Sequence, residues 1–448
     1  MNKNAYLISL ITLAIPAIIE NSLQSLVGFV DTLFISKLGI NEVASVGIAN
    51  NILQIYFAVF MAISTASTIY ISRYTGAKEP EKVKQTITHS LILTIIVGLL
   101  FGLISWLLAE NLLKLLGASD EVLSQGVLYF RIVTTPSLLI SLMYTLGAIL
   151  RGTGDTKSPM RVGIIMNVAH IGLDYVLIFG VFFEGFGIAG AGAATVIARL
   201  IGVILLFRSL INKQLITTVF SYWKLNINVF KGLLNLGLPT GFERLFMRVG
   251  QVIYFGMILR MGTEVYAAHT ITGNLTIFAT IVGTGLGVAT TTLIGKSLGA
   301  NDSEGAKKYA KVSIVITSVS MSIISVIMFA TSPWIAPIFT TNATVISLII
   351  IALGIDTLVQ PAIGTVSAYT SILQAGGDTK FPMYSTAIGI WAIRTVGVYV
   401  FGIHFGLGIV GVRIAIAIDN YVRAGFLYYR YRSNKWIKKL NIGSLNTQ

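Results

Sequence analysis

The sequence predicts an all-α integral membrane protein whose twelve transmembrane helices form two homologous six-helix lobes. Three observations predict this class. Of the 448 residues, 54% are hydrophobic and only 11% are charged, whereas soluble domains carry about 25% charged residues. Apolar stretches long enough to cross a bilayer, about 20 residues each as helix, recur along the whole chain. The second half of the sequence also repeats residues of the first half at one constant offset.

The apolar stretches are separated by short polar breaks, which leave no room for a sizeable soluble domain. The first stretch continues past Glu20 as one long span, so we interpret it as a retained helix and not as a signal peptide. The predicted spans cover residues 10–35, 44–71, 88–109, 127–149, 161–182, 188–210, 233–259, 267–294, 311–331, 345–372, 384–402 and 408–429.

Basic residues gather in the loops after even-numbered spans and in the C-terminal tail. Examples are Arg73, Lys82, Arg151, Lys157, Lys213, Lys296, Lys307 and Arg430. Because cytoplasmic loops are enriched in lysine and arginine, this pattern places both termini in the cytoplasm. The net charge of +14 is therefore a topology signal in a chain whose partner is the lipid bilayer, and it does not indicate nucleic acid.

The repeat is clearest in a polar motif that follows the fourth and the tenth span. "RGTGDTKSPM" at residues 151–160 returns as "QAGGDTKFPM" at residues 374–383, an offset of 223 residues (374 − 151). The same offset pairs Pro16 with Pro239. Chance does not preserve one register over so long a stretch, so we infer two homologous halves.

We assign residues 1–220 to an N-terminal lobe that includes the start of the linker, and residues 221–448 to a C-terminal lobe with a basic cytoplasmic tail. Each lobe has an even number of spans, so both enter the membrane from the same side. A pseudo-two-fold axis along the membrane normal then relates them. Transporters with parallel repeats of this kind bind substrate near the membrane midplane and rock one half against the other.

Polar side chains lie inside two of the predicted spans, where an ionisable group costs about 3 kcal/mol or more. Spacings of four, three and four place one set on a single face of the first span: Glu20, Gln24, Val27 and Asp31. Spacings of three and four do the same in the fifth span: Asn167, His170 and Asp174. Both spans run outward from the cytoplasm, so Asp31 and Asp174 are expected in the outer half of the bilayer, at a depth that allows a shared site.

Two interpretations of Asp31 remain open. The carboxylate either forms hydrogen bonds that only serve helix packing, or it binds a cation together with Asp174. Two neighbouring carboxylates with little water around them suit the uptake and release of a proton near neutral pH, and their oxygens could equally bind a sodium ion. The offset pairs Asp31 with Tyr254, so the acid is absent from the second half.

Glu20 and Glu243 each follow a proline by four residues. We assign them a structural role first, bracing a neighbouring helix or an arginine such as Arg244 or Arg248. A cation relay or a contact with substrate is the functional alternative, and Gln24 and Tyr254 are further candidates for the substrate cavity. His269 is interpreted as a packing residue. The charged residues of the later spans are interpreted as ion pairs: Asp356, Arg394 and Asp419.

No cofactor is predicted. The stretch "LIGKSLG" lacks the glycine that a phosphate-binding loop needs five residues before Gly295, where Thr290 stands. The absence of cysteine excludes a disulfide or a thiolate metal site. No catalytic constellation is recognisable, so we expect no enzyme activity, and any uphill transport would have to use an ion gradient or another subunit.

Three features together resemble the multidrug and toxic compound extrusion (MATE) family, in particular its bacterial branch that includes DNA-damage-inducible protein F. They are "GFVDTLFISKLG" at the end of the first span, the paired "GTGDTKSPM" and "GGDTKFPM", and "LDYVLIFG" in the fifth span. The resemblance covers essentially the whole chain. It implies two six-helix lobes and export of amphipathic, often cationic compounds in exchange for protons or sodium ions.

The resemblance also implies site residues. Asp31 and Asp174 match the family's cation residues in the first lobe, and they are where a coupling sodium ion would bind. His170 stands where the family has an asparagine, and Asn167 lies one turn earlier, so both join the predicted cation-binding set. The acidic cluster of the second lobe that another branch of the family has is not evident, because the tenth span holds only Asp356.

These observations lead to one main hypothesis and two alternatives. The first is a multidrug efflux antiporter, driven by protons or sodium ions, that acts as a monomer in a bacterial plasma membrane. The second is a flippase for a lipid-linked or amphipathic lipid substrate, which predicts a broader basic lining for a phosphate head group. The third is a non-transporting receptor or a membrane-embedded enzyme.

Overall fold

The computed structural model describes residues 3–181, 184–216 and 226–438, and every regular element in these ranges is a helix. The chain divides into two compact units. Unit 1 contains residues 1–18 and 238–448, and unit 2 contains residues 19–237. The predicted all-α membrane class with two lobes is confirmed. The boundary predicted between residues 220 and 221 lies outside the described residues.

The helices account for all twelve predicted spans. Within the described residues, nine helices are long and apolar enough to cross a membrane, and a bent pair supplies a tenth span. The two remaining spans are helices that carry more charge: α8 (Ile227–Leu259) contains Glu243, Arg244 and Arg248, and α13 (Gly408–Arg432) contains Arg413, Asp419 and Arg423. A simple apolarity criterion therefore misses them.

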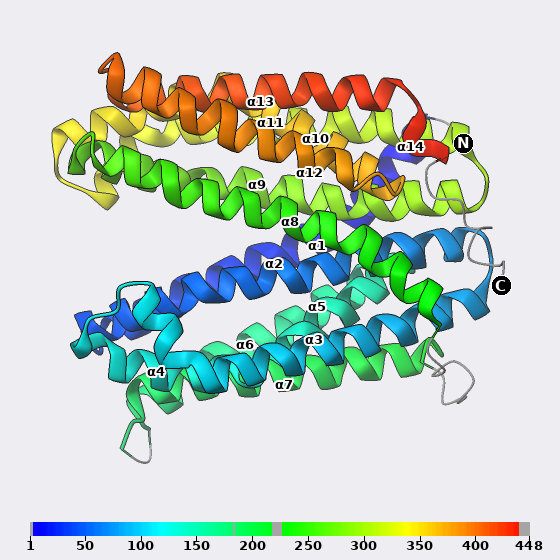
Figure 1. The fold of residues 1–448 in the computed structure, drawn as a ribbon, viewed down its shortest axis with the longest axis horizontal. Helices are drawn as coiled ribbons and strands as arrows, with labels where there is room; N and C mark the ends of the chain where they lie inside the picture. Colours follow the sequence, from blue (N-terminus) through cyan, green and yellow to red (C-terminus); the bar gives the residue numbers. More distant parts are fainter. Residues whose placement is uncertain (1–2, 182–183, 217–225, 439–448) are drawn as a thin grey trace. The chain divides into compact units, whose positions relative to one another are not determined.

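Unit 2 is a bundle in which helices far apart in sequence lie side by side (Figure 1). The second helix packs against the third, fourth and fifth, and the sixth packs against the seventh. A cluster of buried apolar side chains, among them Phe60, Phe130 and Leu113, forms its core. The elements are α1 (Lys3–Ser36), α2 (Ile40–Gly76), α3 (Pro80–Leu115), α4 (Asp120–Thr134), α5 (Ser137–Gly152), α6 (Lys157–Phe179) and α7 (Gly187–Asn212).

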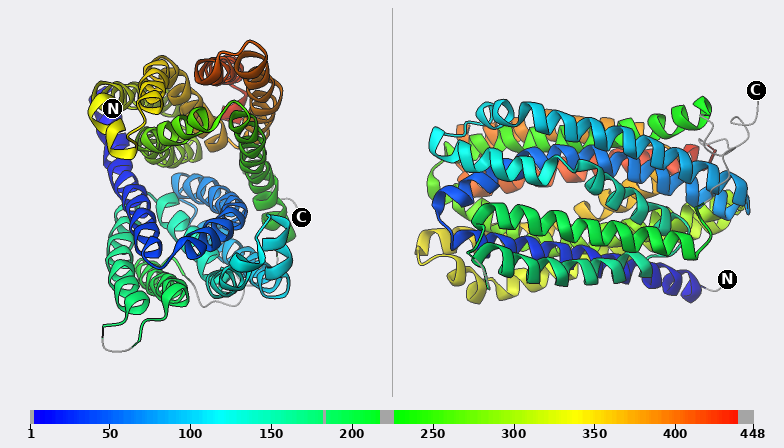
Figure 2. Two further views of the ribbon diagram at one scale, coloured as in Figure 1. Left: turned by 90° about the vertical axis from the view of Figure 1, so that its left-hand side faces the viewer. Right: turned by 90° about the horizontal axis from the view of Figure 1, so that it is seen from below.

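Unit 1 is a second bundle, and the left-hand view of Figure 2 shows most of its helices end-on. The tenth and eleventh helices pack closely against each other and against the ninth, and the thirteenth packs on the eleventh. Besides α8 and α13, its elements are α9 (Thr263–Gly299), α10 (Ser303–Phe339), α11 (Ala343–Ala375), α12 (Lys380–Ala387), η2 (Ile388–Thr395), η3 (Val398–His404) and α14 (Lys435–Lys438).

Two spans depart from straight α-helices. The fourth is broken into α4 and α5 with a bend of 44°, and Pro136 lies at the break. Proline lacks a backbone N–H and clashes with the preceding turn, so it interrupts a helix at this position. The eleventh span contains the two π-helical segments η2 and η3, a rare conformation that often accompanies functional sites.

The repeat in the sequence is also a repeat in structure. Gly154 and Gly377, paired by the offset, have φ angles of 90° and 83°, and glycine adopts this left-handed conformation without steric cost. The next residues, Asp155 and Asp378, donate equivalent backbone hydrogen bonds to the carbonyls of Leu150 and Leu373, at 2.9 and 2.8 Å. The paired motif therefore forms the same helix-ending turn in both halves.

The units and the sequence halves divide the chain differently near two prolines. The division between units falls after Ile18 within α1 and after Gly237 within α8. Pro16 and Pro239 lie inside these same helices, each within two residues of the division. The first segment of each helix thus belongs to the unit formed mainly by the other half of the sequence.

Candidate functional site

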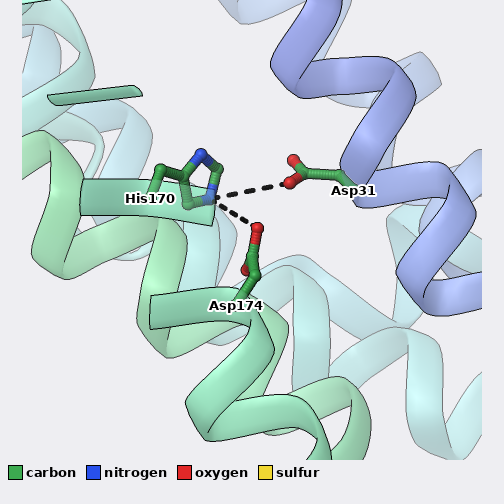
Figure 3. Close-up of side chains that lie close together, drawn as sticks. All are labelled: Asp31, His170 and Asp174. Carbon is green, nitrogen blue, oxygen red and sulfur yellow. Dashed lines mark ion pairs between the residues drawn. The ribbon is translucent and has the colours of Figure 1, made fainter. Parts of the chain in front are cut away.

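Two helices of unit 2 bring together three of the predicted site residues. Asp31 projects from α1, and His170 and Asp174 project from successive turns of α6, with the three side chains converging on one point (Figure 3). A spacing of four residues places His170 and Asp174 on one face of their helix. The structure therefore brings together Asp31 and Asp174, which were expected at similar depth in the membrane.

The geometry of this cluster is compact. His170 Nε2 lies 3.5 Å from Asp174 Oδ2 and 3.9 Å from Asp31 Oδ1, and the three atoms lie within 4.8 Å of one another. The Asp174 and His170 side chains are buried, while the Asp31 side chain retains 28% of its accessible surface. The site is thus enclosed on the α6 side and partly open at Asp31.

The hydrogen bonds of the cluster leave two carboxylate oxygens without a partner. His170 Nε2 lies 3.1 Å from Thr195 Oγ1, and Thr195 donates its own proton to the Ala191 carbonyl at 2.9 Å. With that assignment Nε2 carries a proton and donates to Thr195. Asp31 Oδ1 and Asp174 Oδ2 are buried and have no hydrogen-bond partner among the described residues, so they are the acceptors available to an incoming cation.

Burying a carboxylate without a partner is costly, so these two oxygens favour the uptake of positive charge. The two carboxylates at this separation can take either a proton or a metal cation, whereas Nε2 of His170 already carries a proton and cannot ligate a metal. Sodium, a hard cation, prefers oxygen ligands as magnesium and calcium do, whereas an imidazole nitrogen beside two carboxylates suits the exchange of protons. The presence of His170 at the centre therefore fits a proton better than a sodium ion.

Three nearby residues of unit 2 were not predicted. Thr195 comes from α7, and Tyr129 from α4 is an electrostatic neighbour of Asp31 and Asp174. Arg199 from α7 also interacts electrostatically with Asp31, while its Nη1 donates a hydrogen bond of 3.3 Å to the Val133 carbonyl. No spacing in the sequence indicated them, because they come from helices whose rotation the sequence does not give.

The other residues of the two predicted stripes differ in burial. Asn167 is buried on α6, one turn before His170. Gln24 is exposed and Val27 is buried. Whether Asn167 or Gln24 contacts a substrate stays a prediction.

Glu20 and Glu243 make equivalent contacts within their own units. Arg151 Nη1 lies 3.1 Å from Glu20 Oε1, and Gln374 Nε2 donates a hydrogen bond of 3.1 Å to Glu243 Oε2. The offset of 223 residues pairs Arg151 with Gln374 (374 − 151), and both begin the repeated motif. Each glutamate therefore binds the first residue of this motif, which fits the structural interpretation and adds Arg151 as a partner.

Unit 1 pairs the remaining buried charges. Arg394 Nη2 lies 2.6 Å from Asp419 Oδ2, and Arg413 Nη1 lies 3.1 Å from Asp356 Oδ2. These contacts fit the predicted intramembrane ion pairs. The buried Tyr254 ring lies under the Arg394 guanidinium, 5.7 Å from its centroid. His269 packs edge-on against Phe255, with ring centroids 4.9 Å apart, which fits the packing role.

Comparison with known proteins gives relatives along the whole chain. The model of the MatE family matches residues 16–176 and 239–400. The uncharacterized transporter YisQ of Bacillus subtilis is 31% identical over 434 residues, which cover 96% of this chain and 95% of that protein. The probable multidrug resistance protein NorM of Thermotoga maritima is 28% identical over 432 residues, which cover 96% and 93%.

A solved structure gives the same fold. The Vibrio cholerae MATE transporter VcmN in its bent form aligns with a TM-score of 0.90 at 21% identity, and the alignment covers 98% of each chain. The two ranges matched by the family model begin 223 residues apart (239 − 16), which is the offset of the repeat. Membership of the particular branch with DNA-damage-inducible protein F stays a prediction. The chain is a multi-pass membrane transporter and not an enzyme, and it belongs to the MatE family.

Proposed function

We propose that this protein is a cation-coupled efflux antiporter that exports amphipathic, often cationic compounds by alternating access. The observation that carries the proposal is the cluster of Asp31, His170 and Asp174, whose two unpartnered carboxylate oxygens converge with an imidazole nitrogen. Relatives named as multidrug resistance proteins in Thermotoga maritima and Pseudomonas aeruginosa support this substrate class. We further propose a bacterial cell membrane, cytoplasmic termini and a monomer.

The proposed coupling follows from charge balance. An excess negative charge in a poorly hydrated site is unfavourable until a cation enters. A bound cation neutralises the cluster and thereby favours one conformation, and its release on the other side of the membrane restores the charge. We propose the proton as the coupling ion, because His170 Nε2 lies within 3.9 Å of an oxygen of each carboxylate. The relatives' names do not favour the flippase alternative.

The test is transport of a fluorescent cationic dye by purified protein in liposomes, with proton and sodium gradients imposed separately. We expect export to follow the proton gradient in the wild type and its rate to fall about tenfold or more in Asp31→Asn, which corresponds to a transport barrier about 1.4 kcal/mol higher. Glu110→Gln is the matched control, because this acid is exposed and pairs with Lys114 on the same helix. Export by Asp31→Asn at the wild-type rate would contradict the proposal.

A further inference from the structure

The buried carboxylates of the two units face different cationic side chains. Asp419 is fully buried and Asp356 nearly so. Each lies within 3.1 Å of a guanidinium nitrogen, from Arg394 and Arg413 respectively. In unit 2, Asp31 Oδ1 and Asp174 Oδ2 instead lie 3.9 and 3.5 Å from Nε2 of His170. Unit 1 therefore pairs its carboxylates with arginine, which keeps its charge, and unit 2 pairs them with histidine, which can lose its charge near neutral pH.

The repeat relates Asp31 to a residue that contacts Arg394. The offset of 223 pairs Asp31 with Tyr254 (31 + 223) and His170 with Ile393 (170 + 223), which precedes Arg394. The Arg394 guanidinium lies over the Tyr254 ring at 5.7 Å. Arg394 thus stands one residue after the counterpart of His170 and contacts the counterpart of Asp31. Where Asp31 faces a titratable imidazole, its counterpart Tyr254 faces a fixed positive charge.

The surroundings make the ion pair of Arg394 permanent. Tyr254 belongs to a buried apolar cluster that includes Val398, Val412 and Ala415, so little water is available to either partner. Arginine does not lose its proton in proteins, and removing one partner of a buried pair leaves an uncompensated charge. Arg423, one turn after Asp419, directs its Nη2 to Thr386 Oγ1 at 2.8 Å and also interacts electrostatically with Asp419.

We propose that unit 1 retains a counterpart of the coupling site in which arginine side chains, chiefly Arg394, occupy the place of the exchangeable cation. This inference rests on the proposed function and adds that unit 1 binds no coupling cation in the transport cycle. Asp419 is then a latent cation site, that is, a carboxylate whose cation position is occupied by the guanidinium of Arg394. Only the cluster of unit 2 sets the number of cations exchanged for each substrate molecule.

The number of cations exchanged for each dye molecule can be measured directly. In liposomes with the membrane potential held at zero, a fixed tenfold gradient of the coupling ion is imposed, and the dye gradient at which net dye flux stops is determined. Each additional exchanged cation raises that dye gradient about tenfold, because one tenfold concentration ratio corresponds to about 1.4 kcal/mol. The measurement requires folded transporter but no knowledge of the natural substrate.

Two variants of unit 1 test the proposal against the wild type. Arg394→Met leaves Asp419 without its ion-pair partner, so we expect an additional cation and a zero-flux dye gradient about tenfold above that of the wild type. Arg394→Met combined with Asp419→Leu removes both charges, and we expect it to keep the wild-type gradient. Arg432→Met is the control, since it makes the same change at an exposed position on the helix that carries Asp419.

Two results would overturn the inference. A lower zero-flux gradient in the double variant would mean that Asp419 exchanges a cation in the wild type. An unchanged gradient in folded Arg394→Met would mean that no latent site exists. If Arg394→Met does not fold, the double variant still tests whether Asp419 exchanges a cation in the wild type, and a lower zero-flux gradient in it overturns the inference. Failure of the proposed function is recognised separately, because Asp31→Asn would then retain full ion-driven export.

Discussion

The carboxylates of this chain differ in role because their oxygens contact different groups. Asp31 and Asp174 face the imidazole of His170 at 3.9 and 3.5 Å, whereas Oδ1 of Asp155 accepts hydrogen bonds from the backbone N–H groups of Lys157 and Ser158 at 3.1 and 3.0 Å. Asp155 also forms an ion pair with Lys213 at 2.9 Å. Satisfied acceptors stabilise a turn, while unsatisfied acceptors are available to a ligand.

The pH dependence of stability can be predicted at Asp155, which lies in the loop between α5 and α6. Burial alone would raise the pKa of its carboxyl, but hydrogen bonds from Ser158 and the charge of Lys213 outweigh burial and lower this pKa below its ordinary value. A lowered pKa means that the ionised form stabilises the fold above the ordinary value, about 3.9, and that this stabilisation is lost as the pH falls through the lowered pKa.

We therefore expect Asp155→Asn to lower the free energy of unfolding by up to about 1 kcal/mol at pH 7, with the deficit shrinking below about pH 4. Thermal unfolding of detergent-purified protein followed by tryptophan fluorescence measures both. Asp155→Ala, which also loses the hydrogen bonds to the start of α6, should be less stable at every pH. A deficit of Asp155→Asn that stayed constant down to acidic pH would contradict this assignment.

How far the site could be predicted from the sequence depends on whether its residues share a helix. The spacing within one helix fixes a common face, so His170 and Asp174 were found together, and equal depth brought in Asp31. Thr195 and Arg151 were missed because each contributes from another helix, and the rotation of that helix depends on its packing. The charged residues inside the later spans predicted that ion pairs exist in unit 1. They did not predict which arginine pairs with which aspartate.

At the scale of single elements, the apolar stretches predicted all twelve spans. The spans that correspond to α8 and α13 were among them, although both helices contain charged residues. The bend between α4 and α5 was not predicted, although Pro136 at the break is a local signal for it. The π-helical segments η2 and η3 were not predicted either, and no local signal marks them, because such segments depend on tertiary contacts such as the pairing of Arg394 with Asp419. The predicted fifth span extends to residue 182, outside the described residues, whereas α6 ends at Phe179.

Pro16 lends itself to a prediction about one element. It removes a hydrogen bond from the interior of α1 two residues before the division between units. Pro16→Ala would restore that bond and favour a straighter, stiffer helix by up to about 3 kcal/mol. We expect slower amide hydrogen exchange around residues 16–20 and reduced dye export at unchanged or higher melting temperature.

The matched control for Pro16→Ala is Pro80→Ala. Pro80 is the first residue of α3, a position at which the missing N–H costs no helical hydrogen bond. This variant should export dye at the wild-type rate. Wild-type export by Pro16→Ala, with the expected slowing of exchange, would show that α1 does not need to flex at this point during transport.

At the scale of the whole molecule, sequence homology and compactness give different divisions. The repeat predicts halves that meet in the linker, and that boundary stays a prediction. The compact units instead divide within α1 and α8. Homology is preserved along the chain, whereas compactness reflects which side chains pack together. Leu10 and Ala14, for example, pack with Leu286 and Ala289 in the core of unit 1.

Leu10→Ala tests this assignment. Leu10 is fully buried, and truncating such a leucine costs about 2–5 kcal/mol. We expect faster amide hydrogen exchange in α9, which belongs to unit 1, and little change in α2 and α3, although Leu10 lies on the same helix as Asp31. Ile8→Ala, at an exposed neighbouring position, should leave exchange unchanged. Faster exchange confined to unit 2 would contradict the division.

The reciprocal membership of α1 and α8 has a consequence for the origin of the chain. Residues 227–237 of α8 complete unit 2, and residues 3–18 of α1 complete unit 1, so neither half of the sequence builds a whole bundle. An ancestral gene encoding one six-helix half would have produced complete bundles only as a homodimer with exchanged N-terminal arms, an arrangement known as domain swapping. Gene duplication and fusion would then have preserved the swap within one polypeptide.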